Sequence, residues 1–483
     1  MGHLDPPRLP PARPHTDRAA LDGIRAVICL LALALVTSAC APAGALALRA
    51  PGAGSSLERI NHIIVIYQEN HTFDNYFGDF PGADGVANAG DALVQVDKQG
   101  AAYPTLPPPL ANPVDGRRLP DARFSGDMPN GPFIFNDFVP PTDETANIAH
   151  SFYRHQYQIN GGRMNAFVPW SDGGGMVMGR WNVEELPLYR LAREYTLADR
   201  FFQAAFGGSL LNHQWLVCAC TPRFPDAPAA MVSIAFPDDP DHLQDRQMSP
   251  DGYLINHEGS LPAYSVNAPH PPTFNPEQLV PNQTVPTIGD RLTEAGVGWA
   301  WYAGGWDDAM AGNPHVRFQF HHQPFAYYAN YADGTEAKAE HLRDERDFLA
   351  ALADGTLPAV SFVKPIGLDN EHPGYTTVQR GQQHVADLVE VVQRSPYWDD
   401  SLIVITYDDY GGGWDHVAPP IVDRWGPGTR VPTVVVSPLA RRGHVDHTTY
   451  DTTSILKTIE MRWNLAPLGT RDRDANDLRS ALE

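Results

Sequence analysis

Five short runs of apolar and β-branched residues constrain the fold of this chain more than any other feature. Each run ends in turn-forming or charged residues, which is the pattern of a strand buried on both faces of a sheet. The runs are "INHIIVIYQEN" from residue 60, "VGWAWYAGG" from 297, "LPAVSFVKP" from 357, "SLIVITYDD" from 401 and "RVPTVVVSP" from 430. We therefore expect several buried strands in this chain.

Helical patterns lie between the later runs. The residues with the spacing of one apolar helix face are Val385, Leu388, Val389 and Val392. A second amphipathic segment spans 452–463, and Asp451 before it is a candidate N-cap. Buried strands that alternate with helices predict an α/β fold, in which helices sandwich a mostly parallel central sheet.

The first forty residues have the layout of a secretory signal peptide. Arginines precede the apolar run "AVICLLALALV", which ends in the small residues "TSAC". We expect residues 1–40 to direct export and residues 41–57 to be a linker, so the mature protein is periplasmic, secreted or lipid-anchored. "TSAC" resembles a lipoprotein cleavage box, and a lipid on Cys40 is the only membrane attachment that we expect; cleavage after Ala47 is the alternative.

Two long regions lack periodicity and are rich in Pro, Gly, Asp and Asn. They extend from about 79 to 141 and from about 221 to 286. We expect both to be loop excursions or cap elements on a single catalytic domain at 58–483. The sequence shows no internal repeat, and no apolar run after the N-terminal one is long enough for a membrane helix.

The net charge restricts the ligands that this chain attracts. The 483 residues include 57 acidic and 35 basic side chains, so the formal net charge is -22. The electrostatic field of this net negative charge repels nucleic acid, and we expect no nucleic-acid partner. A phosphate-bearing ligand must then be held by local features such as a metal, histidines or a helix N-terminus.

The cysteines do not form a disulfide framework in a chain of this length. Cys218 and Cys220 lie two residues apart, a spacing that strains a disulfide. We expect them to be buried free thiols.

Two pairs of oxygen-bearing side chains close predicted strands. Glu69 and Asn70 follow the first run, and Asp408 and Asp409 follow "LIVITY". Ligands of open α/β sheets bind at the carboxyl ends of the strands, and a divalent cation there would remove the repulsion between neighbouring carboxylates. The three glycines from 411 to 413 would allow the close backbone approach that such a site needs. The alternative is that each pair caps a neighbouring loop.

Ser209 in "FFQAAFGGSLLNHQWLVCA" stands where a helix is expected to begin. A serine at a helix N-terminus is most often an N-cap. The same position directs backbone N–H groups at an incoming anion and places a hydroxyl where a nucleophile would stand. A nearby metal would lower the pKa of that hydroxyl, as metals do for bound water.

Histidines complete the set of candidate site residues. An adjacent pair in an aromatic-rich segment is more suggestive than any single histidine, because imidazoles bind metals and donate to phosphoryl oxygens. For each of them a structural role is the alternative. The histidines singled out are His150, His321, His322, His372, His416 and His447.

Together these segments resemble the bacterial phosphoesterase family that contains secreted phospholipases C and acid phosphatases, whose fold resembles alkaline phosphatase. The resemblance lies in "QENHTFDNYFG", "GGSLLNHQWL", "FHHQPF", "NEHPGY", "TYDDYGGGWDHVAPP", "GTRVPTVVVSP" and "DHTTYDTTSILKTIE". It implies an alkaline-phosphatase-like fold and one divalent metal ion of unknown identity. The implied metal ligands are Glu69, Asn70, Asp408 and Asp409.

The resemblance also implies the roles of the remaining residues. Ser209 would be the nucleophile, and the catalytic histidines around the phosphoryl group would be His150, His321, His322 and His372. Asn70 would bind the substrate together with His321, His322 and His372. Many relatives carry Asp-Glu where this chain has Asp408-Asp409, which leaves the identity of the metal open.

The implied activity is that of an exported, metal-dependent phosphoesterase. "GGSLLNHQ" and the histidine pair are similar to the acid phosphatases, which implies hydrolysis of small phosphate monoesters through a phosphoserine, with an acidic optimum if the imidazoles are cationic. One alternative is a phospholipase C or another phosphodiesterase that binds a phospholipid head group, with the aromatic-rich segments 299–306 and 318–328 as its apolar approach. The other is an inactive exported phosphate-binding protein.

Overall fold

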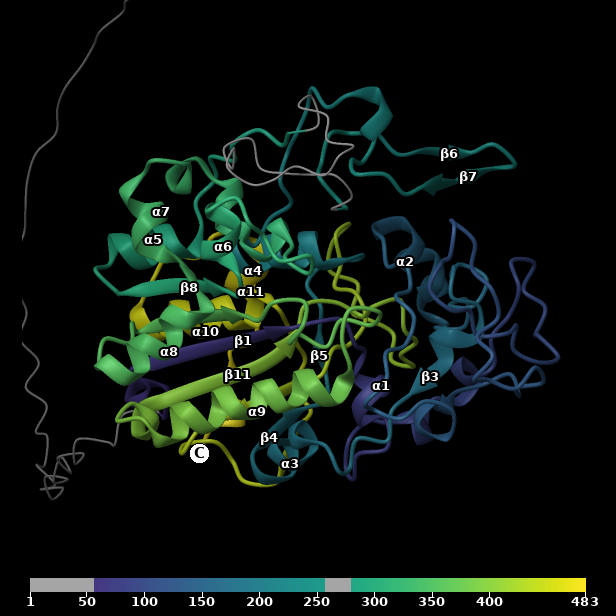
Figure 1. Cartoon of the computed structure of the whole chain (residues 1–483), viewed down its shortest axis with the longest axis horizontal. Helices are drawn as coiled ribbons and strands as arrows, with labels where there is room; N and C mark the ends of the chain where they lie inside the picture. Colours follow the sequence, from purple (N-terminus) through teal and green to yellow (C-terminus); the bar gives the residue numbers. More distant parts are fainter. Residues whose placement is uncertain (1–55, 257–278) are drawn as a thin grey trace, which may run out of the picture. The chain divides into compact units, whose positions relative to one another are not determined.

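An eight-stranded sheet forms the centre of the fold in the computed structural model, which describes residues 56–256 and 279–483 (Figure 1). The strand order is β13-β4-β12-β11-β1-β10-β8-β9. The strands are β1 (His62–Gln68), β4 (Thr196–Ala198), β8 (Trp299–Ala303), β9 (Leu342–Asp344), β10 (Val360–Lys364), β11 (Ser401–Tyr407), β12 (Thr433–Val436) and β13 (His444–Asp446). Each of the five predicted runs contributes one strand, which confirms the predicted sheet.

The sheet is parallel except at β12. This strand runs antiparallel to both of its neighbours, with Ile403 opposite Val436 and Val434 opposite Leu197. All other pairs in the sheet are parallel. No helix separates β11 from β12, so the chain returns beside β11 in the opposite direction.

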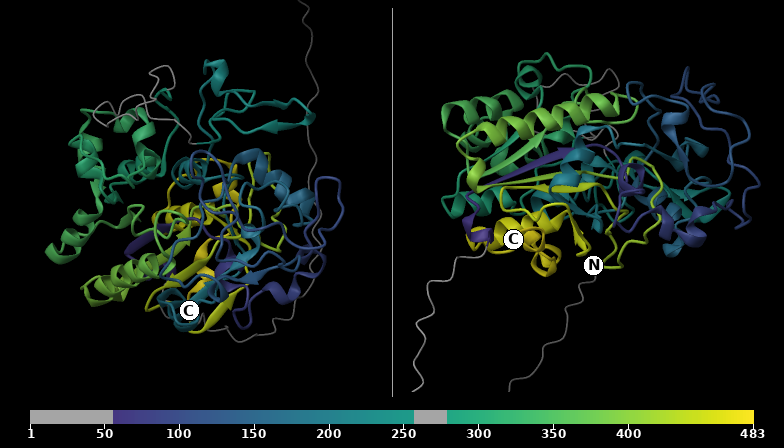
Figure 2. Two further views of the ribbon diagram at one scale, coloured as in Figure 1. Left: turned by 45° about the vertical axis from the view of Figure 1, so that its right-hand side comes forward. Right: turned by 90° about the horizontal axis from the view of Figure 1, so that it is seen from below.

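Helices cover both faces of the sheet, as the sequence predicts. One layer contains α3 (Pro187–Glu194), α8 (Glu345–Asp354) and α9 (Val378–Arg394), and the other contains α4 (Ser209–Cys218), α5 (Ile288–Glu294) and α10 (Thr453–Trp463). Figure 2 shows α9 and α10 on opposite sides of the sheet. The central strands lose water on both faces, which is why β1 and β11 are almost continuously apolar.

The helix patterns in the sequence correspond to real elements. The four predicted apolar positions of α9 are all buried, and the side chain of Thr377 caps its first turn. α10 begins at Thr453, whose backbone N–H donates to Asp451 Oδ1 at 2.7 Å. None of the helices in the described part of the chain is both long and apolar enough to cross a membrane.

Smaller elements surround the carboxyl ends of the strands and the edges of the sheet. The remaining helices are α1 (Phe73–Phe77), α2 (Phe152–Ile159), α6 (Trp306–Met310), α7 (Glu336–His341) and α11 (Thr470–Asp474). The two-stranded pairs are β2 (Phe133–Ile134) with β3 (Gly179–Arg180), β5 (Phe201–Phe202) with β14 (Tyr450–Asp451), and β6 (Ile234–Phe236) with β7 (Asp239–Gln244).

The two predicted excursions contain little regular structure. The region 79–141 contains short 3₁₀ turns and β2, and the region 221–286 contains a 3₁₀ turn and the β6–β7 hairpin among its described residues. The signal peptide at 1–40, including Cys40, and residues 41–55 of the predicted linker lie outside the described residues. The domain limits at 58–483 therefore stay a prediction.

The expectation of free thiols at Cys218 and Cys220 is wrong, because the two residues form a disulfide. α4 ends at Cys218, and Ala219 adopts the left-handed conformation with φ 49°. This sharp turn brings the two Cα atoms within 5.1 Å, a separation that a disulfide spans. Spacing along the sequence did not reveal this turn.

Burial of β1 can be tested with Ile64, which is fully buried. Ile64→Ala should lower the free energy of unfolding by about 2–5 kcal/mol, because it removes packed methyl groups and leaves a cavity. Ile421→Ala is the matched control, since Ile421 is fully exposed, and it should change the free energy by less than about 0.5 kcal/mol. Urea unfolding measures both, and two equally small changes would contradict the buried strand.

Candidate active site

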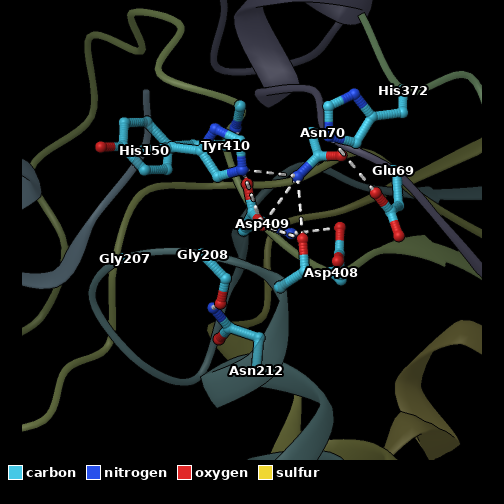
Figure 3. A network of polar contacts seen from close by, with 12 residues as sticks. Glu69, Asn70, His150, Gly207, Gly208, Asn212, His372, Asp408, Asp409 and Tyr410 are labelled. Atoms are coloured by element: carbon cyan, nitrogen blue, oxygen red, sulfur yellow. Dashed lines mark hydrogen bonds and ion pairs between the residues drawn. The ribbon is translucent and has the colours of Figure 1, made fainter. Parts of the chain in front are cut away.

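The two predicted pairs of oxygen-bearing side chains lie side by side at one edge of the sheet. β1 and β11 are adjacent and parallel, with Gln68 opposite Tyr407, so the residues that follow each strand meet. Glu69, Asp408 and Asp409 are all completely buried there. Asp408 and Asp409 also cap the loop that follows them, since the Oδ1 atom of each accepts a backbone N–H, but capping alone does not explain why three carboxylates converge on one buried position (Figure 3).

Ser209 lies next to this cluster. Its Oγ donates to Asp409 Oδ2 at 3.0 Å, and the side-chain amide of Asn70 donates to Ser209 Oγ at 3.2 Å and to Asp409 Oδ2 at 2.8 Å. Three predicted site residues thus form one closed triangle of hydrogen bonds. Only 2% of the Ser209 surface is exposed.

The first turn of α4 directs Ser209 toward the carboxylates. Ser209 is the first residue of the helix, and Gly208 occupies the N-cap position without a side-chain cap. The serine is therefore not the N-cap. A Cβ on Gly208 would lie 2.8 Å from the carbonyl oxygen of His150, so the close packing of these two segments requires glycine. The first N–H groups of a helix have no partner within the helix and suit an anion.

Glycine also allows the 411–413 loop to approach Asn70. Gly411 has φ 59° and Gly412 has φ 77°, both in the left-handed region. A Cβ on Gly411 would lie 2.3 Å from the Asn70 carbonyl oxygen. The backbone N–H of Gly411 also donates to Asp409 Oδ1 at 2.7 Å. The predicted need for close backbone approach is confirmed at this position.

Three of the predicted histidines contact the cluster directly. His150 Nε2 lies 3.3 Å from the Asn70 amide nitrogen (Figure 3). Its Nδ1 donates to the carbonyl oxygen of Ile148. His372 Nε2 lies 3.7 Å from Glu69 Oε2, and His322 Nε2 contacts Glu69 Oε1.

The other predicted histidines lie farther out. His321 is buried, with its ring centre 4.6 Å from that of His322. His416 and His447 lie elsewhere, where they pair with Asp74 and Asp199.

Sequence reasoning missed two cationic or metal-binding side chains at the site. Lys364, the last residue of β10, places its Nζ 2.8 Å from Glu69 Oε1 and 3.9 Å from Asp408 Oδ2. His213 donates from Nδ1 to the Ser209 carbonyl oxygen at 2.8 Å and stacks on His322. Lys364 ends an apolar run and has no polar neighbour, whereas His213 lies between Asn212 and Gln214 in "LLNHQWL", a segment in which only Ser209 was singled out.

Burial sets the protonation of the site residues. Burial lowers the pKa of His372 to about 3 and also lowers that of His322, so both rings are neutral near pH 7. Burial also raises the pKa of Asp408 and of Asp409. In Glu69 the effect of burial is outweighed by His322 and Lys364, which hold its pKa well below the usual range. An acidic optimum that depends on cationic His322 and His372 is therefore not supported.

The donor atoms of this cluster suit a divalent cation. Glu69 Oε2, Asp408 Oδ2 and Asn70 Oδ1 are buried and accept no hydrogen bond, whereas Glu69 Oε1 contacts both Lys364 Nζ and His322 Nε2. Buried oxygens without such partners are costly, whereas a hard cation would bind them well. The structure thus brings together Glu69, Asn70, Asp408 and Asp409 in a set that could hold a metal.

A second acidic cluster lies in the "WDH" segment. Asp74, Asp415 and His416 place ligand-type atoms within 4.8 Å of one another. The buried Arg430 already fills this cluster, with Nε 2.9 Å from Asp415 Oδ1 and Nη2 3.0 Å from Asp74 Oδ1. Because a guanidinium supplies the positive charge there, we assign this cluster to stability.

Glu371, also missed from the sequence, supports the loop that carries His372. Its two carboxyl oxygens accept hydrogen bonds from the hydroxyls of Tyr76 and Tyr407, each at 2.7 Å. Its backbone adopts a left-handed φ of 73°, a conformation that is uncommon for a residue other than glycine. Burial raises the pKa of Glu371 to about 8, so it is protonated at neutral pH.

The aromatic-rich segments that the phosphodiesterase alternative expects to form an apolar approach are mostly buried, although Phe318 and Phe320 in the second segment are only half-buried. Trp299, Trp301, Trp306, Phe325 and Tyr327 are all buried in the core. Strand β8 and the turns after it use these side chains to pack the sheet, and the sequence alone did not distinguish this role from a lipid-binding surface.

Known proteins resemble this chain along most of its length. The sequence model of the Phosphoesterase family matches residues 60–466. Phospholipase C B from Mycobacterium tuberculosis is 27% identical over 473 residues, which cover 90% of this chain and 80% of that protein. Non-hemolytic phospholipase C from Pseudomonas aeruginosa is 23% identical over 478 residues, which cover 91% of this chain and 59% of that protein.

Solved structures also resemble it. A protein in the alkaline phosphatase superfamily from Vibrio parahaemolyticus matches with a TM-score of 0.34 and 10% identity, covering 69% of this chain and 73% of that one.

The raised pKa of Glu371 gives a pH-dependent prediction. The ordinary pKa of this carboxyl is 4.5, and its pKa in the folded protein is about 8. Its contribution to the free energy of unfolding is therefore fully present below pH ~4.5 and is lost as the pH rises through about 8. Glu371→Gln imitates the neutral acid. We compare the free energy of unfolding of the variant with that of the wild type at each pH. The difference, variant minus wild type, should be roughly 2–4 kcal/mol larger at about pH 8.5 than at about pH 4.5. Urea unfolding measures this difference, and parallel pH profiles of the two proteins would contradict it.

Proposed function

Because this chain belongs to the Phosphoesterase family, we propose that it hydrolyses phosphate esters with Ser209 as its nucleophile. The observation that carries the proposal is the triangle of Ser209, Asn70 and Asp409 at the N-terminus of α4. The triangle joins a buried hydroxyl, a carboxylate that can accept a proton and an amide donor. It lies beside further carboxylates that could bind a metal. Such an arrangement suits phosphoryl transfer, in which positioning and charge stabilisation dominate.

In the first displacement, Ser209 Oγ attacks phosphorus in line with the leaving oxygen. The Oγ–P bond forms while the bond from phosphorus to the leaving oxygen breaks, and Asp409 Oδ2, 3.0 Å from Oγ, takes the hydroxyl proton. A divalent ion held by Glu69, Asn70, Asp408 and Asp409 would polarise the hydroxyl and a phosphoryl oxygen. In the second displacement, a water oxygen bonds to phosphorus while the P–Oγ bond breaks. The proton held by Asp409 returns to Ser209 Oγ, and both water protons leave with the phosphate.

The other residues stabilise the charge that develops on the phosphoryl group. The Asn70 amide and the free N–H groups of the first turn of α4 point to the place where the phosphoryl oxygens would lie. His150, His322 and His372 border the same space, with His321 behind them. The neutral rings of His322 and His372 can donate N–H groups to the phosphoryl oxygens, and water protonates the leaving oxygen.

We propose a small phosphate monoester as the preferred substrate. Ser209, His322 and His372 are all at least 95% buried, which favours a compact ester over a lipid. Most aromatic side chains of the predicted apolar approach pack in the core, and only Phe318 and Phe320 in those two segments are half-buried. The serine in "GGSLLNHQ" is similar to that of the acid phosphatases and supports the same proposal.

The second candidate is a phosphodiesterase of the phospholipase C type. The relatives from Mycobacterium tuberculosis and Pseudomonas aeruginosa are both phospholipases C, and this supports a phospholipid head group as the substrate. The triangle around Ser209 suits either ester, because both reactions begin with attack on phosphorus.

Removing the nucleophile gives the first test. Ser209→Ala should lower kcat for a small phosphomonoester by roughly a thousandfold or more, because no other hydroxyl occupies its place. The circular dichroism spectrum and the bound metal should not change. Ser209→Thr is the matched control, since it keeps a hydroxyl and should retain measurable turnover. Unchanged hydrolysis by Ser209→Ala would exclude Ser209 as the nucleophile.

The substrate class can be tested separately with wild-type protein. A small aryl phosphomonoester should give a kcat/KM at least about tenfold above that of a phosphocholine diester, measured from about pH 4 to 9. The reverse preference would identify a phospholipase C. No turnover of either ester, together with binding of inorganic phosphate, would favour an inactive phosphate-binding protein.

A further inference from the structure

Lys364 is buried among the candidate metal ligands. It ends β10, which lies next to β1, and its side chain is completely buried beneath the carboxylates. Its Nζ lies 2.8 Å from Glu69 Oε1, 3.9 Å from Asp408 Oδ2 and 3.4 Å from the carbonyl oxygen of Gln68. The ring of Tyr67 covers it from another side at 5.3 Å. A lysine is almost never fully buried unless its charge is paired.

Lys364 and Ser209 occupy different sides of the cluster. Lys364 contacts Glu69 and Asp408, whereas Ser209 donates to Asp409 and accepts from Asn70. The ammonium therefore leaves the Asp409 side open to a metal and to the substrate. Because Lys364 has no exposed surface, it acts through the carboxylates and is a positioning residue.

The charges of the cluster can be counted. Glu69, Asp408 and Asp409 would supply three negative charges as metal ligands, and Lys364 supplies one positive charge. The cluster then keeps a net charge of −2, which one divalent cation neutralises. The neighbouring histidines are ring donors that also suit a metal, so the donor atoms alone do not restrict the site to one ion.

We propose that Lys364 occupies the place of a second cation and restricts this site to one divalent ion. The ammonium neutralises the Glu69–Asp408 side permanently, and a second dication there would face a positive charge within a few ångströms. Without the ammonium, the Glu69 and Asp408 oxygens and the nearby imidazoles would be available to another ion. This inference rests on the metal site of the proposed function.

The test measures how many Mn²⁺ ions each variant binds. Wild type, Lys364→Met and Lys364→Arg are purified with Mn²⁺ in all buffers, folding is checked by circular dichroism, and bound Mn²⁺ is measured by elemental analysis and titration calorimetry. Lys98→Met is the matched control, because it removes an exposed ammonium far along the chain from the site. We expect one ion per chain in the wild type, Lys364→Arg and Lys98→Met, and two ions in Lys364→Met.

The outcomes separate this inference from the proposed function. One ion in both the wild type and Lys364→Met would overturn the role of Lys364 and leave the metal site intact, whereas no ion in the wild type would overturn both. If Lys364→Met does not fold but Lys364→Arg folds with one ion, the carboxylates need the positive charge, which supports the inference. If Lys364→Arg also fails to fold, the size and shape of the side chain matter instead of its charge, and the inference is wrong.

Discussion

The convergence of three buried carboxylates is the constraint on which the site depends. Glu69 follows β1 and the two aspartates follow β11, so the parallel pairing of these strands forces their side chains together at one edge. Removing such charges from water is expensive unless positive charge and hydrogen-bond donors compensate. Lys364 from β10, the Asn70 amide and the N-terminus of α4 supply part of that compensation, and each comes from an element that the sheet itself positions.

Two buried acidic clusters in the described part of the chain differ in the basic side chain that pairs with them. In one, Arg430 bonds to Asp74 and Asp415 with several N–H groups, and its planar guanidinium satisfies both carboxylates. In the other, the compact ammonium of Lys364 reaches only one side and leaves buried oxygens without a hydrogen bond. The cluster around Arg430 is therefore complete as a structural unit, whereas the cluster around Glu69 keeps buried oxygens that could bind a metal. This difference could not be read from the motif that contains Asp408, Asp409, Asp415 and His416.

Much of the fold was predictable from the sequence, because long apolar runs report burial on both faces of a sheet. The antiparallel direction of β12 was not, since "TVVV" has the same pattern in either direction, and the short strands β4, β9 and β13 carry too few residues to give a signal. At the site, residues in pairs or in turn-forming segments were found, among them Glu69, Asp409 and Ser209. Lys364 was missed because it is a single polar residue at the end of an apolar run, and its partners come from distant segments. His213 and Glu371 lie among other polar residues, in "NHQ" and "DNEH", and nothing in those segments marks their contacts with the Ser209 carbonyl oxygen and with the two tyrosines.

The most direct test of the central claim is to look for the covalent intermediate on Ser209. Wild-type protein would be mixed briefly with a phosphomonoester, quenched with denaturant and digested, and the peptides would be examined by mass spectrometry. The account predicts one phosphoryl group on the peptide that contains Ser209, present during turnover and absent without substrate. Turnover with that peptide unmodified under the same conditions, or with the phosphoryl group on a histidine, would contradict it.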